Sequence, residues 1–406
     1  MRGIPSSVLT FFFAFVFLVE FISYLGFRQL TYRATKKMQW YLSVLYLSVS
    51  IFTIVMLIYA FSNPESIRQS RDYTFFYFVI IVSFFNLVPK SFFAITTILS
   101  YFIRWFAGQR WQLITLNGSF LIGSGIFLVL SYGLFIGRYK VIVNKQNLYF
   151  DNLPEQLDGF KIVQLSDIHL GSFRNNPRVL KETIKMIEIL HPDLLLFTGD
   201  MVNNFSEEIK GFEPYLTQLS AKYGKYAIQG NHDYGDYYEW PDSLSKRKNL
   251  DQIESGLTNA GFKLLLNQWE KIVVKDTSFA LIGVENWGHK PFPQYANLDI
   301  AMKGIPLNSF RILMTHDPAH WKAIVVPQTD IPLTLSGHTH GGQFGLKIAG
   351  IEFCPIYIVQ KYWGGLYKTD NQYLYVNRGL GTIGFSGRIE MNPEITLLTL
   401  FRTKNH

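Results

Sequence analysis

Two histidines stand one residue apart in the segment LSGHTHGGQFG, residues 335–345. The apolar run before them predicts a strand, and side chains at positions i and i+2 of a strand point to the same face. His338 and His340 are therefore expected to face one point, and the glycines beside them let backbone approach that point closely. Such a pair can bind a metal ion, although a polar loop with two histidines is the alternative for this segment taken alone.

Four further apolar runs end in polar residues of the same kind: FKIVQLSD, DLLLFTGD, YAIQGNHD and FRILMTHD. At or just after these strand ends stand Asp167, His169, Asp200, Asn231, His232, Asp233 and His316. In open α/β sheets, ligands bind just beyond the carboxyl ends of the strands. Five of the nine histidines fall in these clusters, which random placement would rarely produce. The pattern predicts a metal site.

The types of ligand narrow the metal and the reaction. Imidazole, carboxylate and one amide oxygen, without thiolate, suit Mn, Fe, Zn or Ni. Seven ligands are too many for one tetrahedral ion and fit two divalent ions that share a carboxylate. Two ions about 3.5–4 Å apart clamp the attacking and departing oxygens of a phosphoryl group. The seven predicted ligands are Asp167, His169, Asp200, Asn231, His316, His338 and His340.

Other residues near these clusters are candidates for contact with the substrate. His232 follows a ligand asparagine and is expected to act as a general acid for the leaving alkoxide or to stabilise developing charge. Asp233 is expected to orient the His232 ring through its other nitrogen. Arg174 and Arg378 are weaker candidates for paired hydrogen bonds to a substrate phosphate. For both arginines the alternative is a surface or structural role.

The motifs SDIHLGS, TGDMV, GNHDY, MTHDP and SGHTHGGQFG, in this order, resemble the five blocks of the calcineurin-like metallophosphoesterase family. The late segments LYVNRGLGT and PEITLLTL resemble its membrane-attached bacterial branch, which includes UDP-2,3-diacylglucosamine hydrolase-like enzymes. The resemblance covers residues 158–402. It implies a first metal held by Asp167, His169, Asp200 and His340, and a second held by Asp200, Asn231, His316 and His338. It also implies that His232 is the catalytic histidine.

The first 140 residues have the composition of membrane helices. Residues 8–27, 41–61 and 113–137 are apolar over about the 20 residues that a bilayer requires. Residues 74–106 predict a fourth helix, kinked at Pro89, with Lys90 extending toward the membrane surface. Glu20 lies inside the first span, where a carboxylate is by default a functional hypothesis. The alternative is that Glu20 lies near the interface or is protonated against another helix.

From about residue 150 the pattern changes to apolar strands alternating with helical segments such as PRVLKETIKMIEIL. FKLLLNQWEKIVVKDTSFALIGVEN predicts successive antiparallel strands, and QYLYVNRG and EITLLTLF predict late strands that close a second sheet. We therefore predict an all-α transmembrane region of about four spans in residues 1–140. An α/β metallophosphoesterase domain of stacked mixed β-sheets flanked by helices is predicted for residues 150–406.

The composition limits the partners. The net charge is +8, but no basic run or basic patch with interleaved aromatics occurs, so we expect no nucleic acid partner. Cys354 is the only cysteine, which excludes a disulfide within the chain. We expect the bilayer as a partner and a lipid or glycolipid phosphate as substrate, because tethering raises the effective concentration of headgroups. The alternatives are an anchored phosphodiesterase for soluble, nucleotide-like substrates, and a membrane sensor or transport module with a regulatory phosphoesterase domain.

The distribution of basic residues bears on orientation in a bacterial inner or plasma membrane. Four spans place the N-terminus and the α/β domain on one side. That side carries Arg2, Arg68, Arg71, Arg138, Lys140 and Lys145, and the other carries Arg28, Arg33, Lys36, Lys37, Arg104 and Arg110. This is a tie by the positive-inside rule, but the cluster of four in the first loop favours an extracytoplasmic α/β domain.

Overall fold

The computed structural model describes residues 6–63, 73–288, 293–348 and 351–403. The chain divides into two compact units. The helical unit comprises Met1–Leu134 with Gly384–Ser386, and the α/β unit comprises Phe135–Ile383 with Gly387–His406. Arg2, Arg68 and Arg71, three of the basic residues on the predicted side of the α/β domain, lie outside the described residues.

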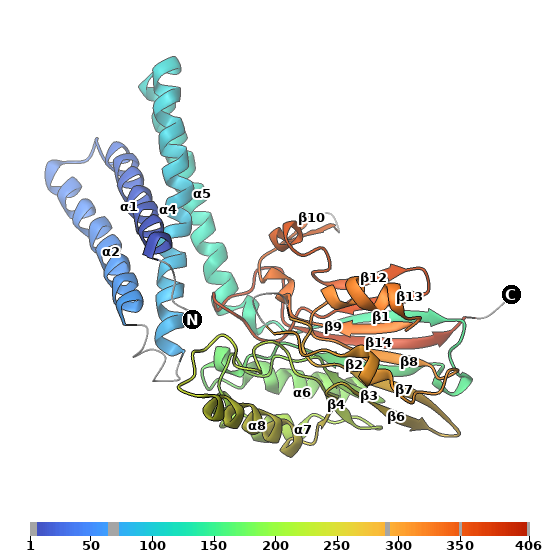
Figure 1. The fold of residues 1–406 in the computed structure, drawn as a ribbon. Helices are drawn as coiled ribbons and strands as arrows, with labels where there is room; N and C mark the ends of the chain where they lie inside the picture. The colour runs from blue at the N-terminus through green and yellow to red at the C-terminus, as the bar shows by residue number, and fades with distance from the viewer. Residues whose placement is uncertain (1–5, 64–72, 289–292, 349–350, 404–406) are drawn as a thin grey trace. The chain divides into compact units, whose positions relative to one another are not determined.

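The described residues of the helical unit form four long apolar helices. They are α1 (Ser6–Leu30), α2 (Lys36–Ser62), α4 (Thr74–Ala107) and α5 (Gln109–Phe135), drawn from blue to cyan-green in Figure 1. Each is long and apolar enough to cross a membrane, which confirms the predicted number of such helices. As predicted, α4 continues through Pro89 as one helix.

A buried polar cluster joins three of these helices. The ammonium group of Lys90 on α4 donates to the Glu20 carboxylate on α1 and to the Ser50 hydroxyl on α2, each at 2.8 Å. Asn86 also donates to Glu20, at 2.6 Å. The prediction that Lys90 extends toward the membrane surface is therefore wrong, because a carboxylate within the helix bundle compensates its charge.

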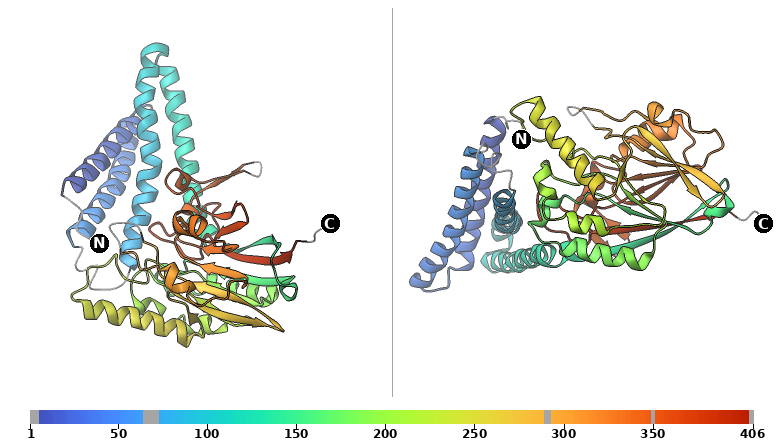
Figure 2. Two further views of the ribbon diagram at one scale, coloured as in Figure 1. Left: turned by 45° about the vertical axis from the view of Figure 1, so that its right-hand side comes forward. Right: turned by 90° about the horizontal axis from the view of Figure 1, so that it is seen from below.

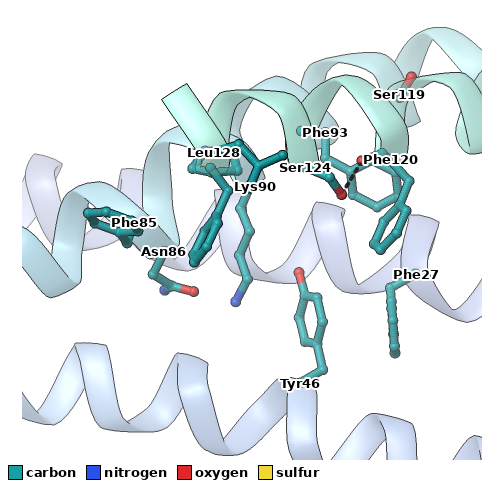
Figure 3. Close-up of a pocket in the computed structure, with 13 residues that line it drawn as sticks. Phe27, Tyr46, Phe85, Asn86, Lys90, Phe93, Ser119, Phe120, Ser124 and Leu128 are labelled. Atoms are coloured by element: carbon teal, nitrogen blue, oxygen red, sulfur yellow. Dashed lines mark hydrogen bonds between the residues drawn. The ribbon is translucent and has the colours of Figure 1, made fainter. Parts of the chain in front are cut away.

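A cavity of about 400 Å³ lies beside this cluster, bordered by residues of all four helices. Phe27, Phe85 and Phe120 are among the aromatic side chains of its wall, and Lys90 and Tyr46 lie on its polar side (Figure 3). The Lys90 ammonium lies 4.1 Å from the centre of the Tyr46 ring. The volume falls within the range of about 300–1,000 Å³ that is typical of small-molecule sites.

The α/β unit is built on two six-stranded sheets (Figure 1). In spatial order, the first sheet contains β1 (Ile142–Phe150), β14 (Glu394–Arg402), β2 (Phe160–Leu165), β3 (Leu194–Phe197), β4 (Lys225–Ala227) and β5 (Lys263–Leu264). The second contains β12 (Gly365–Thr369), β13 (Gln372–Val376), β9 (Leu333–Ser336), β8 (Arg311–Met314), β7 (Thr277–Gly283) and β6 (Gln268–Val274). A separate hairpin pairs β10 (Leu346–Ile348) with β11 (Ile351–Phe353).

Both sheets are mixed. Strands β2 to β5 run parallel in the first sheet, and β7, β8, β9 and β13 run parallel in the second. The predicted antiparallel pair is β6 with β7. The prediction that EITLLTLF closes the second sheet is wrong, since β14 lies in the first sheet between β1 and β2. Most of β14 is buried, on both faces, as an interior position in a sheet requires.

The two sheets stack around an apolar core. Ile162, Leu196 and Leu398 from the first sheet share this core with Leu281 and Ile312 from the second. Helices α6 (Arg178–Leu190), α7 (Glu213–Gln218) and α8 (Ser243–Asn259) lie together on one outer side of the sheets (Figures 1 and 2). The short helix α9 (Leu298–Met302) packs with β6 and β7 of the second sheet. The predicted class, stacked mixed sheets flanked by helices, is confirmed.

Candidate metal centre

The carboxyl ends of parallel strands from both sheets deliver the predicted ligands. Strand β2 is followed by Asp167 and His169, β3 by Asp200, β4 by Asn231, β8 by His316, and β9 by His338 and His340. Six of these side chains are buried, and His338 is half-buried. Burial of so many polar groups requires compensation of their charges and lone pairs.

One group of ligands gathers around Asp167. Ligand atoms of Asp167, His169 and His340 all lie within 4.8 Å of one another. The Nε2 atoms of His169 and His340 are 3.1 Å apart, and His340 Nε2 lies 3.5 Å from Asp167 Oδ1. Two imidazole nitrogens and a carboxylate oxygen that converge in this way form a set of electron-pair donors suited to a cation.

A second group gathers around Asn231. Its Oδ1 atom lies 3.0 Å from His316 Nε2 and 2.8 Å from His338 Nδ1. Asp200 Oδ2 is 3.2 Å from His316 Nε2 and 3.5 Å from His169 Nε2 in the first group. Asp200 thus lies between the two groups, where a carboxylate shared by two ions would have to be.

The protonation states fit a cation site. Burial lowers the pKa of His169 to about 3 and also lowers the pKa of His338 and of His340, so these rings are neutral and keep a lone pair for a metal. Burial opposes the charging of His316 as well, but the Asp200 carboxylate raises the pKa of His316 to about 10. The carboxylates of the cluster therefore attract positive charge. The donor set fits two divalent ions.

Neighbouring groups fix the orientation of ligand atoms. His316 Nδ1 donates to the Thr198 carbonyl oxygen at 2.7 Å, so Nε2 faces the cluster, where a bound cation would replace its proton. The amide nitrogen of Asn231 donates to the Tyr237 hydroxyl at 2.8 Å, which directs its Oδ1 atom toward the histidines. A carbonyl oxygen only accepts, so the bond to Thr198 keeps the proton of His316 on Nδ1 and would leave Nε2 for a metal ion.

The backbone at the ligands is strained. Asp167, His169, Asp200, His338 and His340 all have positive φ angles, from 44° to 75°. Residues other than glycine rarely adopt this region, and each such residue costs roughly 1–3 kcal/mol. Strain of this kind persists where the surrounding structure enforces it and is concentrated at functional sites.

Close approach of the ligand loops requires glycine. A Cβ atom on Gly230 would overlap Asp200 Oδ1, and one on Gly199 would lie 2.5 Å from the Gly230 nitrogen. The φ of Gly199 is +96°, which also favours glycine. The two glycines that precede Asp200 and Asn231 therefore let these two ligands come together.

His232 lies beside the first group of ligands. Its ring centre is 4.9 Å from that of His169, and it stacks on the Tyr237 ring at 4.4 Å. Its Nδ1 atom donates to the Asn203 carbonyl oxygen at 2.7 Å, which leaves Nε2 as the nitrogen for a substrate. Burial lowers the pKa of His232, while the Asp200 carboxylate raises it.

Asp233 does not orient the His232 ring, contrary to the prediction. Its Oδ2 accepts the backbone N–H groups of Asp200 and Gly230 at 2.9 Å, and its Oδ1 accepts those of Met201 and Val202 at 2.9 and 3.3 Å. A fully buried carboxylate needs several donors, and the loop that carries Asp200 supplies three of them. Asp233 is therefore a positioning residue that ties two ligand loops together.

The two arginines predicted to contact a substrate phosphate do not belong to the buried ligand cluster. Arg378 is buried and pairs with Glu352 and with Glu394, and it lies over the Trp363 ring. These contacts are those expected of a structural arginine, which was the alternative to phosphate binding. Arg174 is exposed and follows the turn Leu170–Phe173, so its contact with a substrate phosphate stays a prediction.

Two residues at the site are missing from the sequence-based set. Arg388 is fully buried, donates to the carbonyl oxygens of Gly381 and Met391, and has a guanidinium nitrogen 3.3 Å from His340 Nδ1. No motif surrounds it, so the sequence offered no signal. Tyr237 holds Asn231 and stacks on His232; the run of aromatic residues directly after GNHD was the available signal.

Comparison with known proteins agrees with this geometry. Residues 160–342 match the family described as calcineurin-like phosphoesterase. The chain is 33% identical over 286 residues to the metallophosphoesterase YkuE of Bacillus subtilis, a match that covers 67% of this chain and 90% of that protein. It is 28% identical over 279 residues to a transmembrane protein with metallophosphoesterase domain from Danio rerio, covering 66% of this chain and 59% of that protein. It is also 28% identical over 266 residues to phosphodiesterase YaeI of Escherichia coli, covering 65% and 89% respectively.

Proposed function

We propose that this chain, which belongs to the calcineurin-like phosphoesterase family, hydrolyses a phosphoester bond of a lipid-linked substrate at a membrane surface. Membership of the family makes it a metal-dependent phosphoric ester hydrolase. One observation supports the lipid-linked substrate: the chain joins four helices apolar enough to cross a membrane to a buried Asp/His cluster. Six residues connect Phe135 at the end of α5 to Ile142 at the start of β1, and this connection spans at most about 25 Å. Anchored helices would keep the α/β unit at the membrane.

The roles of the residues follow from their contacts. Bound divalent ions would supply Lewis-acid polarisation of the phosphoryl oxygens and would acidify the attacking water. The residues that would hold the ions are Asp167, His169, Asp200, Asn231, His316, His338 and His340. Asp233 and Tyr237 keep the loops and the amide of Asn231 in place.

His232 is proposed to protonate the leaving group. The attacking water gives one proton to solvent as its oxygen bonds to phosphorus, the phosphorus–oxygen bond of the ester breaks, and the leaving oxygen takes the proton from His232 Nε2, which solvent then restores. The Asn203 carbonyl holds the ring through Nδ1, so that Nε2 has one orientation. The negative charge of a bound phosphate favours the protonated ring and opposes the effect of burial.

A second candidate is hydrolysis of a soluble phosphodiester. The observation that favours it is the similarity to YaeI, whose name is that of a phosphodiesterase. A sensor or transport role for the helical unit is a further alternative, favoured by the buried Glu20–Lys90 pair and the cavity beside it. Both leave the metal centre as the hydrolytic site.

The test presents one phosphodiester headgroup in two forms to the purified full chain. One form carries acyl chains and is mixed into detergent micelles, and the other is the water-soluble headgroup alone. The proposal predicts that the acylated form has the higher kcat/KM and that its rate rises with its mole fraction in the micelle. Equal kcat/KM for the two forms would favour the soluble phosphodiester.

The α/β unit is proposed to face the extracytoplasmic side of a bacterial inner or plasma membrane. Support comes from the four basic residues of the first loop, Arg28, Arg33, Lys36 and Lys37. Cys354 is buried, so labelling of introduced cysteines has a low background. A membrane-impermeant maleimide should label Leu307→Cys in intact cells, since Leu307 is 92% exposed. Labelling only after lysis would place the unit in the cytoplasm.

A further inference from the structure

Five large apolar side chains of the α/β unit are exposed within a short stretch of chain. They are Leu346, Phe353, Tyr357, Ile358 and Val359, which we call the apolar segment. Ile358 and Val359 are 81% and 82% exposed. Apart from Phe135 and Ile136 at the end of α5, the other exposed large apolar residues of the described α/β unit, such as Leu244, stand singly in the sequence. Single exposed apolar residues are normal, whereas a cluster marks a contact surface.

The apolar segment has a defined shape. Leu346 is directly opposite Phe353 in the β10–β11 ladder, so both side chains lie on the same face of the hairpin. The chain then enters the 3₁₀ turn Pro355–Ile358. Cys354, directly before this turn, is buried, and its thiol donates to the Gly341 carbonyl oxygen at 2.8 Å. The exposed side chains are thus carried by a backbone that is fixed from beneath.

The support beneath the apolar segment is the loop that carries metal ligands. A Cβ atom on Gly342, two residues after His340, would lie 2.8 Å from Cys354 Sγ and 3.1 Å from Ile356 Cβ. Thr339, directly before His340, donates to the Trp363 carbonyl oxygen at 2.6 Å. Trp363 lies four residues beyond the segment, whose own contacts are with Gly341 and Gly342, so the segment packs against the backbone directly after His340. Whatever contacts the segment lies close to the metal centre.

The residue types indicate what that contact is. Aliphatic side chains and a tyrosine suit the boundary between headgroups and acyl chains, and exposed lysines next to them suit anionic headgroups. Lys347 lies within the segment, where it pairs with Glu352 at 3.2 Å, and Lys361 lies two residues after it; both lysines are exposed. The six-residue connection to α5 limits how far the α/β unit can move from a membrane that holds the helices. A lipid surface would bury the exposed apolar side chains and attract the lysines. It also lies within the reach that the short connection to α5 allows.

We propose that the apolar segment inserts into the surface of the bilayer and places the metal centre at the level of lipid headgroups. The inference rests on the proposed function, because it takes the four helices to span that bilayer. The proposed insertion also explains how the substrate reaches the site, because a headgroup phosphate can reach the ligand loop without leaving the membrane. The segment is then a determinant of lipid specificity and takes no part in the chemical step.

Insertion can be measured without any assay of activity. Ile358→Cys and the control Leu307→Cys are labelled with an environment-sensitive fluorophore in the full chain, with the wild type as the blank for Cys354. Each is reconstituted in nanodiscs of phosphatidylcholine and phosphatidylglycerol with plain or brominated acyl chains. Brominated chains should quench the label at 358 and leave the label at 307 unquenched. Equal quenching at both positions, or a label at 358 shielded from water but not quenched by bromine, would overturn the proposal.

A second measurement separates this inference from the proposed function. The double variant Ile358→Asp/Val359→Asp should lose at least about tenfold in turnover of vesicle-borne lipid phosphodiester and keep its rate on a water-soluble aryl ester. The control Leu307→Asp should keep both rates. A fall in both rates for the double variant would mean that the segment supports the ligand loop and does not bind lipid. If the wild type cleaves no lipid while the label at 358 is quenched, the proposed substrate is wrong and the insertion stands.

Discussion

Replacement of Asp233 by asparagine tests whether this carboxylate positions the ligand loops or acts in the chemistry. Each carboxylate oxygen accepts two backbone N–H groups, one pair from Asp200 and Gly230 and the other from Met201 and Val202. An asparagine keeps one acceptor oxygen and turns an NH₂ group toward the other pair. Two buried donors lose their acceptor, at about 1–3 kcal/mol each, so the variant should be less stable by about 2–6 kcal/mol.

The assay is the thermal unfolding of the full chain, with metal content measured on the same samples. At about 2–4 °C per kcal/mol for a domain of this size, the unfolding temperature of the α/β unit should fall by roughly 5–20 °C. Because the tied loops carry Asp200 and Asn231, metal retention should fall as well. Hydrolysis should be lost in proportion to the metal.

Asp193→Asn is the matched control. Asp193 accepts one backbone N–H, from Lys161 at 2.9 Å, and the asparagine carbonyl can take over that bond. This control should unfold within a few degrees of the wild type. If Asp233→Asn instead unfolds like the wild type, retains metal, and loses rate as His232→Ala does, then Asp233 acts through His232 and the positioning role is refuted.

The remaining predictions concern five residues. His232→Ala should retain both metals and lose about 10²–10⁴-fold in rate on an alkyl phosphoester, with a much smaller loss on a nitrophenyl ester that needs no proton, as steady-state rates will show. Asp200→Asn should weaken both metal sites, measured as metal content. Gly230→Ala should lose metal and stability, because its Cβ would overlap Asp200 Oδ1. Lys90→Met should destabilise the helical unit by about 3–5 kcal/mol, and Glu20→Gln added to it should restore part of that loss in a detergent unfolding assay.

The main features of the metal centre could be predicted because they depend on local sequence. An apolar run followed at once by Asp, Asn or His places the ligand at a strand end, and parallel strands bring such ends together. Asp200 and His316 come from different sheets, yet both were found in this way. The strained backbone at five of the ligands was not visible in the sequence, because φ angles follow from the contacts of the folded loops.

The wrong predictions share a physical cause: in each case the side chain or strand pairs with a residue or strand that is distant in the sequence. Lys90 has aliphatic length enough to reach a membrane surface, but Glu20, 70 residues earlier, offers its charge a closer partner. Asp233 is adjacent to His232 in the sequence, yet its carboxylate bonds to backbone amides 31 to 33 residues away. The pattern of β14 predicted a strand correctly, but only its pairing with β1 and β2 determines which sheet it joins.

The most direct test of the central claim is a metal titration of the full chain after chelation. The chelated protein should not hydrolyse an aryl phosphodiester. Activity should return on addition of Mn, Zn, Fe or Ni and should reach its plateau at two bound ions per chain, as the two groups that meet at Asp200 require. Full activity in the chelated protein, or a plateau at a single bound ion, would contradict a centre of two ions built from these seven ligands.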